Sequence, residues 1–452
     1  MLLAHNHHYV GFRERNGASA SYTLLILILL LFQIATLPPE LWRECMRWAT
    51  LPPSGRLPLD DSLTMLDPCP VGMPHDPFRF LFPENAYGFE QSCLYPTKRA
   101  LMLVSRAWAE LAVEYMYESL VIDRFGVGRP EQVFAALEGS AGFVFKKWVR
   151  RVDIFQSPFM KDYVCERLAR IGLPNLRVQN MFYTRYVGMV PFGNLLPEQP
   201  LHLVEPCGSP ILGRLTSRGE AFGCLRCLTL WMINPLPTPF HLPSNLRRLT
   251  IFVHDTDYLQ IRNIFSTRDS VALPNLTHLA LYDMYQSPDR FVRFMEIINH
   301  IGPQLHHLSL TADNGYQDWT GTHLSTILRV CTQLTELVIP SHLDTWEVDP
   351  GDYGHPILQT LGIPMMSTTE WVYTSTFDIF SRREAFPKLS TIRLVSCERW
   401  EEAIPSLAPY ALRLRGHGIW FEDYWGHPIP PASVPEDQNQ HLLTRCMDAV
   451  PL

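Results

Sequence analysis

The chain has 452 residues and a formal net charge of −7, and 46% of its residues are hydrophobic. This length leaves room for two or three domains, and the apolar content is enough for a sizeable core. The acidic balance argues against nucleic-acid binding, which needs clustered basic charge. The ten cysteines are scattered and Cys224 and Cys227 form the one close pair. The sequence therefore predicts no disulfide framework and no metal site, and it favours a reducing compartment.

Residues 1–35 consist of a polar leader and a short apolar segment. The run from Leu24 to Phe32 is unbroken, and residues 22–35 are mostly apolar. It is shorter than the roughly 18–20 residues that a membrane-spanning helix needs. Two upstream arginines make it similar to a signal-peptide core, but no small-residue cleavage site clearly follows. A cytosolic protein with an unusual leader, a membrane anchor at 22–35 and a non-native extension all remain open.

A short helix is predicted directly after this leader. Pro38 suits the first turn, where no intrahelical N–H bond is lost, and Glu40 places a negative charge at the positive end of the helix dipole. Apolar side chains then recur at helical spacing, at Leu41, Cys45 and Trp48. Two prolines at 52 and 53 end the helix.

A second helix is predicted from Thr97, which can cap it. Its apolar stripe consists of Leu101, Val104, Trp108, Leu111 and Tyr115. An insertion at residues 51–95, rich in Pro and Gly, separates the two helices. Two short helices with wide apolar faces cannot bury all of that surface in each other, so a partner or the next domain should cover part of it.

These two segments carry a resemblance to a known family. Leu37-Pro-x-Glu40-Leu41 followed by Val104-Ser-Arg-x-Trp108 resembles the F-box, which typically opens with Leu-Pro-x-Glu-Leu and closes with Val-Cys/Ser-Lys/Arg-x-Trp. The surrounding residues are similar to F-box proteins of mushroom-forming fungi. The motifs cover about residues 36–122, and the module is predicted at 36–118. The insertion departs from the family pattern, since the usual second helix cannot be assigned in it, and an ordinary helical hairpin is the alternative.

The resemblance implies docking onto the Skp-type adaptor of a cullin-RING ubiquitin ligase, and with it a cytoplasmic or nuclear location. The adaptor-binding residues carried over from the motif, with two leucines added from the helix pattern, are Leu37, Pro38, Glu40, Leu41, Leu101, Val104, Trp108 and Leu111. The rest of the chain would hold an unknown target protein near the ubiquitin carrier. Catalysis would then come from proximity, because a slow encounter becomes intramolecular.

From residue 119 onward, a six-residue pattern recurs with apolar side chains at its first, fourth and sixth positions. Its starts are Val149, Leu173, Leu225, Leu246, Leu276, Leu305, Leu334, Leu358 and Leu389, and from Leu246 they are 30, 29, 29, 24 and 31 residues apart. Such steps are typical of leucine-rich repeats, although the ninth position mostly lacks the usual Asn or Cys. Residues 119–398 are therefore predicted to form an irregular, leucine-rich-repeat-like solenoid of mixed α/β class. Short parallel strands would lie inside and amphipathic helices outside.

Residues 399–452 break this pattern. Aromatic side chains cluster at Trp420, Phe421, Tyr424 and Trp425. They are predicted to cap the open end of the repeats, with ligand binding as the alternative. The Pro-rich residues that follow His427 suggest a poorly ordered tail.

Catalytic motifs are missing from the sequence. It contains no phosphate-binding Gly-Lys loop, no His-Glu-x-x-His and no Gly-x-Ser-x-Gly. The prediction is a binding protein, not an enzyme, without cofactor or metal. A repeat scaffold that is unconnected to a ligase, and possibly membrane-anchored through residues 22–35, is the alternative function.

The repeat frame also predicts a target-binding row. Alternate strand residues point to opposite sides, so the third, fifth and seventh positions should face the inner surface of the repeats. The side chains chosen from these positions are Trp231, Arg248, Phe252, His278, Tyr282 and His307. Aromatic residues and Arg are the usual energetic anchors of interfaces, which favours contact with the target. The alternative is that loops or the aromatic tail cover the row.

Overall fold

The computed structural model describes the chain in segments. They are residues 38–51, 83–123, 130–139, 142–156, 164–183 without 165–166 and 169, 202–206, 223–232, 242–253, 273–283, 288–312, 321–339, 354–364, 372–396, 400–423 and 428–429. The leader at 1–35 and most of the C-terminal tail lie outside these segments. The prediction of a mixed α/β chain with parallel strands is confirmed.

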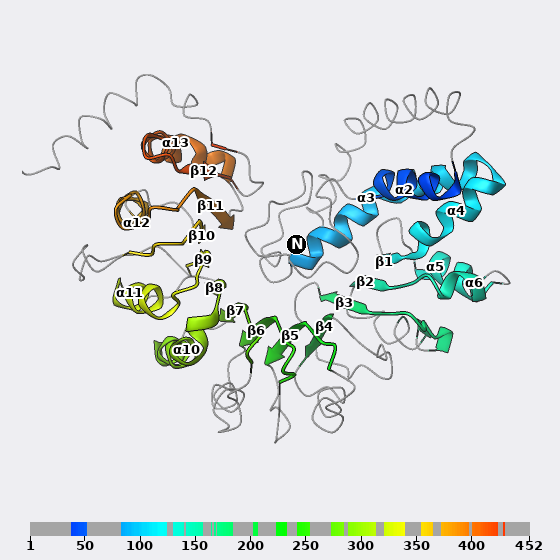
Figure 1. Ribbon diagram of the computed structural model, residues 1–452, viewed down its shortest axis with the longest axis horizontal. Coiled ribbons are helices and arrows are strands. Elements are labelled where there is room, and N and C mark those ends of the chain that lie inside the picture. Colours follow the sequence, from blue (N-terminus) through cyan, green and yellow to red (C-terminus); the bar gives the residue numbers. More distant parts are fainter. Residues whose placement is uncertain are drawn as a thin grey trace, which may run out of the picture.

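The described segments form one sheet of twelve strands, and these strands are neighbours in sequence order. They are β1 (Ser119–Asp123), β2 (Arg151–Gln156), β3 (Val178–Tyr183), β4 (His202–Pro206), β5 (Cys227–Met232), β6 (Arg248–Val253), β7 (His278–Asp283), β8 (His307–Ala312), β9 (Glu336–Val338), β10 (Thr360–Pro364), β11 (Thr391–Ser396) and β12 (Trp420–Glu422). Every pairing between them is parallel. The sheet bends into an arc whose inner side the strands line (Figure 1).

Helices accompany the strands on the outer side of this arc (Figure 1). Those between strands are α5 (Pro130–Glu138), α6 (Gly142–Lys146), α10 (Pro288–Ile301), the 3-10 helix η4 (Gly302–Gln304), α11 (Gly321–Val330), α12 (Val372–Phe380) and α13 (Trp400–Gly416). Among the residues that the structure describes, three more precede the sheet: α2 (Pro39–Ala49), α3 (Pro83–Val104) and α4 (Arg106–Tyr117). A parallel strand pair needs such a crossover, because the chain must return to the starting edge of the sheet.

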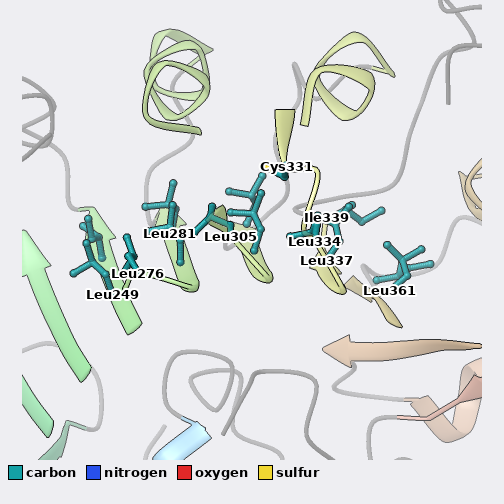
Figure 2. Packing of buried hydrophobic residues seen from close by; sticks show 14 of the residues in the cluster. Leu249, Leu276, Leu281, Leu305, Cys331, Leu334, Leu337, Ile339 and Leu361 are labelled. Atoms are coloured by element: carbon teal, nitrogen blue, oxygen red, sulfur yellow. The ribbon is translucent and has the colours of Figure 1, made fainter. Parts of the chain in front are cut away.

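The core lies between the sheet and the outer helices, and it is built from the recurring apolar positions. In the repeat that begins at Leu246, the first, fourth and sixth side chains are Leu246, Leu249 and Ile251, and all three are fully buried. The equivalent leucines of neighbouring repeats stack beside them, as Figure 2 shows for Leu276, Leu281 and others. Each repeat alone would leave this stripe exposed, so stacking supplies the hydrophobic stabilisation.

Backbone hydrogen bonds join each repeat to the next just before the strands. The carbonyl of Arg247 accepts from the amides of Thr277 and His278 at 2.9 and 3.0 Å. The same arrangement starts at the carbonyl of Glu118, which accepts from Arg150 and Arg151. One carbonyl thus fixes two amides of the following repeat, which sets the parallel register.

Side-chain amides form a second ladder between repeats. Asn175 donates to the Lys147 carbonyl at 2.7 Å, and Asn275 donates to the Ser244 carbonyl at 3.2 Å. Asn245 and Gln304 make the equivalent bonds to Gly223 and Leu273. These residues directly precede the first apolar position of their repeats. This chain therefore has side-chain amides that bond the neighbouring repeat, but they directly precede the first repeat position and do not occupy the ninth.

The structure corrects the repeat frame at its N-terminal end. Val152 is opposite Gln179, and Ile154 is opposite Met181. Leu176 therefore occupies the first position of that repeat, and the prediction that Leu173 does so was wrong by three residues. Gln179 occupies the fourth position, where the pattern has an apolar residue, so the pattern was assigned three residues too early. Strand β4 was not predicted at all, and the sheet continues past residue 398 with α13 and β12.

The helical region also differs from the prediction. Helix α3 begins at Pro83 and runs through Pro96 and Thr97, so the predicted cap at Thr97 was wrong, and the last part of the segment 51–95 is helical. The stripe from Leu101 to Tyr115 is divided between two helices, because Ser105 is extended. Its hydroxyl accepts from the amide of Trp108 at 3.2 Å and caps α4.

Candidate functional site

The three N-terminal helices pack into a small module. Its core is formed by Met46 of α2, Leu101 of α3 and Ala112 of α4. The indole rings of Trp42 and Trp108 meet with their centroids 4.9 Å apart. These contacts hold the first half of the predicted docking motif against the second half.

One apolar side of α2 is exposed. Leu41 and Trp48 are 50% and 72% exposed, and Cys45 between them is exposed as well, whereas Met46 on the opposite side is buried. At the end of α3, Leu103 and Val104 are 74% and 48% exposed. We call these exposed side chains, Leu41 and Trp48 of α2 with Leu103 and Val104 of α3, the exposed apolar face; the name is collective and states no contact between the two pairs. Large apolar side chains that stay in water in this way are typical of protein interfaces.

The predicted adaptor-binding residues fall into three groups. Pro38, Glu40, Leu41 and Val104 are exposed, while Trp108 and Leu111 are partly buried against the module core. Leu101 is only 4% exposed and supports the module from inside. Leu37 lies outside the described residues.

Two members of the exposed apolar face were missed as site residues. Trp48 lay on the predicted helical stripe of α2, so the signal was present. Leu103 belongs to no motif, and its exposure follows from the end of α3 at Val104.

A compact junction connects this module to the sheet. Tyr117, the last residue of α4, stacks on Phe145 of α6 with ring centroids 4.3 Å apart and planes within 9°. Glu118 lies 3.4 Å from the guanidinium of Arg150, and burial raises the pKa of its carboxyl group despite that charge. Burial also lowers the pKa of Lys98 of α3 to about 8, an effect that the Glu118 carboxylate partly opposes.

The predicted target-binding row proves to be largely covered. Arg248, Phe252 and Tyr282 are 6%, 1% and 6% exposed, and the last two rings are in contact with centroids 5.4 Å apart. His278 and His307 are partly exposed. The side chain of Trp231 lies outside the described part of the chain. Strand alternation gave the direction of these side chains, but it carries no information about what covers them.

The two histidines of this row form a polar ladder with the next strand. Their rings stack 3.9 Å apart, and Nδ1 of His307 lies 2.9 Å from a carboxylate oxygen of Glu336. Burial, helped by the charges of His307, Arg248 and His306, lowers the pKa of His278 to about 2. His278 is therefore neutral at physiological pH.

Within the segments that the structure describes, no group of three His, Cys, Asp or Glu side chains is placed to hold a metal ion. Among the same residues, no helix combines the length and the apolar character needed to cross a membrane. The run at residues 22–35 lies outside these segments.

Comparisons with known proteins add little to this geometry. No family model matches the chain, and no curated protein matches it. Among solved structures, it is similar to a Bacteroides fragilis protein determined by a structural genomics consortium. The identity is 13% and the TM-score 0.30, over 70% of this chain and 77% of that one. A TM-score this low leaves fold and function to be argued from the residues themselves.

Proposed function

We propose that the chain is the substrate-recognition subunit of a Skp-cullin-F-box ubiquitin ligase. Its N-terminal helices would form an F-box-like module, and its strand-helix units would form a divergent leucine-rich-repeat solenoid. The observation that carries the proposal is the position of the exposed apolar face. It contains Leu41 and Val104, and both belong to the motif that resembles the F-box.

The chemistry of this face fits a protein partner with an apolar groove. Burying a large aliphatic side chain contributes about 1.5–3 kcal/mol, and a few such anchors supply most of the energy of an interface. The face offers four large apolar side chains on two helices held together by the module core. The partner proposed for it is the Skp-type adaptor, and the proposed location is cytoplasmic or nuclear because the ligase works there.

The junction between the helical module and the sheet would fix how far the adaptor lies from the target. The ligase gains rate by holding the target near the ubiquitin carrier, so the distance between the adaptor and the target should be fixed. The Tyr117–Phe145 stack and the hydrogen bonds to the Glu118 carbonyl tie the module to the first two strands. The chain itself would break no bond, and it would bind its target through the inner side of the arc.

Binding of a purified Skp-type adaptor to the full chain tests the proposal. Leu41→Glu and Val104→Glu place a charge in the exposed apolar face without disturbing the module core, and each should weaken adaptor binding at least tenfold. Leu412→Glu is the matched control, since Leu412 is 52% exposed on α13 and lies outside this face. It should bind like the unaltered chain.

Two results would count against this function. Adaptor binding that survives the Leu41→Glu, Val104→Glu double variant would show that the face is not the docking site. If the unaltered chain binds no adaptor but still captures protein partners through the repeats, the alternative of a scaffold outside any ligase is favoured.

A further inference from the structure

An open surface cavity of about 430 Å³ lies beside the C-terminal ends of α12 and α13. Its wall includes Arg382, Arg383, Arg413 and His417. Three arginines in one cavity are notable in a chain whose net charge is −7. They come from two segments, the turn that follows α12 and the last turn of α13, which the fold brings together.

The neighbours of these arginines show which charges are already balanced. Arg413 is paired with Asp378 of α12. Arg383 instead donates to three backbone carbonyls: those of His417, Leu389 at 2.6 Å and Gly418 at 3.0 Å. Carbonyls are neutral, so the positive charge of Arg383 is not cancelled by these contacts. The end of α13 carries only about half a negative charge, so part of the positive charge of Arg383 remains.

The position of the Arg383 guanidinium depends on a neighbouring glycine. Gly418 has a φ of +69°, and a Cβ atom on it would lie 2.9 Å from Nη2 of Arg383. The backbone therefore leaves room for the guanidinium, which is held from three sides. Such a fixed guanidinium loses little entropy when it binds a ligand.

Arg382 is the cation that remains available. Its side chain has no ion-pair partner within the part of the chain that the structure describes, and it is only partly buried. Asp378 and Glu384 are the carboxylates on the cavity wall, and Asp378 is already paired. Three arginines against two carboxylates leave the wall with a net positive charge.

We propose that this cavity binds a phosphate group, carried by a small metabolite or by a phosphorylated side chain. The fork of an arginine matches phosphate oxygens bidentately, and a dianion gains more than a carboxylate from a positive wall. The volume lies within the roughly 300–1,000 Å³ typical of ligand sites, so it admits a group larger than phosphate itself. This inference does not depend on the proposed ligase function.

Calorimetric titration of the full chain tests the site, with inorganic phosphate, a three-carbon sugar phosphate, a phosphoserine peptide and the same peptide without phosphate as probes. Arg382→Ala should weaken the phosphate-bearing probes at least tenfold, and Arg382→Lys should weaken them less. Arg329→Ala is the control, because Arg329 is an exposed arginine in the last turn of α11. It should change affinity less than twofold.

The probes also separate the two sources of phosphate. Tighter binding of the sugar phosphate identifies a metabolite site, and tighter binding of the phosphoserine peptide identifies a site for a modified side chain. The proposal is overturned if no phosphate-bearing probe binds at millimolar concentration, or if the phosphoserine peptide is the only such probe that binds and the peptide without phosphate binds as tightly. It is also overturned if Arg329→Ala loses as much affinity as Arg382→Ala while both variants keep the melting temperature of the unaltered chain.

Discussion

Lys98 offers a test of how the junction is built, because a buried lysine carries a calculable cost. Its side chain is 6% exposed on α3, and burial lowers its pKa from 10.5 to about 8. A shift of that size corresponds to about 3 kcal/mol of free energy against the charged form at neutral pH. Replacing Lys98 by Met keeps the aliphatic stem and removes the charge, so it removes this cost.

The net gain should be smaller than that figure. Lys98 has contacts that methionine cannot make, and Glu118 loses one of its three positive neighbours, with Arg150 and Arg47 remaining. Arg150, 3.4 Å away, still faces the carboxylate. We therefore expect Lys98→Met to raise the free energy of unfolding at pH 7 by about 1–3 kcal/mol. Arg99→Met, at the exposed neighbouring position, should change it by less than about 0.5 kcal/mol.

The pH dependence gives an independent check with a definite sign. The folded chain releases the Lys98 proton near pH 8, whereas the unfolded chain keeps it up to about pH 10.5. Between these values unfolding takes up a proton, so the stability of the unaltered chain rises with pH by up to about 1.4 kcal/mol per pH unit. The methionine variant lacks this term, and its advantage should shrink from pH 8 towards pH 10.5.

Urea unfolding of the three chains at pH 7, 8, 9 and 10 measures both effects. Groups that titrate in all three chains cancel when differences are taken. If Lys98→Met is less stable than the unaltered chain at pH 7, and the difference does not change with pH, then Lys98 is held charged by its contacts. The reasoning from burial would be refuted by that result.

Three further predictions concern the ladder, the cavity and the exposed face. Asn275→Ala removes the donor to the Ser244 carbonyl and should lower the free energy of unfolding in urea by about 1 kcal/mol. An unchanged urea midpoint would show that this hydrogen bond between repeats does not stabilise the fold. Gly418→Ala puts a Cβ atom at positive φ and against Arg383, so thermal unfolding should show a loss of about 1–3 kcal/mol; equal stability would mean that the turn relaxes freely. Trp48→Ala, at a 72% exposed position, should leave stability within about 0.5 kcal/mol but lower adaptor affinity, and unchanged affinity would place Trp48 outside the docking site.

The hydrophobic period predicted the core well, because burial constrains residue type most strongly there. Leu279 and Leu281 were placed in the core from spacing alone, and both are buried in the structure. The method failed where a core position carries a polar residue. Gln179 shifted the frame of β3, and Glu205, opposite Leu230, concealed β4.

The end of α3 is marked in the sequence by one residue, but the apolar stripe that continues across it predicts an unbroken helix. Leu101, Val104 and Trp108 keep helical spacing across the break, so periodicity alone predicts a continuous helix. Ser105 was the informative residue, because a serine whose hydroxyl caps the amide three residues later marks a helix start. The break leaves Leu103 and Val104 at a free helix end, where they stay exposed.

For the candidate sites too, the sequence pattern predicted some properties of a residue and the folded structure determined the others. Leu41 was predicted from a motif, and it is exposed on α2, where it keeps the helix period without joining the module core. Phe252 was predicted from strand alternation and is buried, because alternation sets direction but not accessibility. Arg382 was not predicted at all, since its cavity unites two segments about thirty residues apart. Pattern therefore locates surfaces that lie along one element, whereas sites assembled from several elements require the fold.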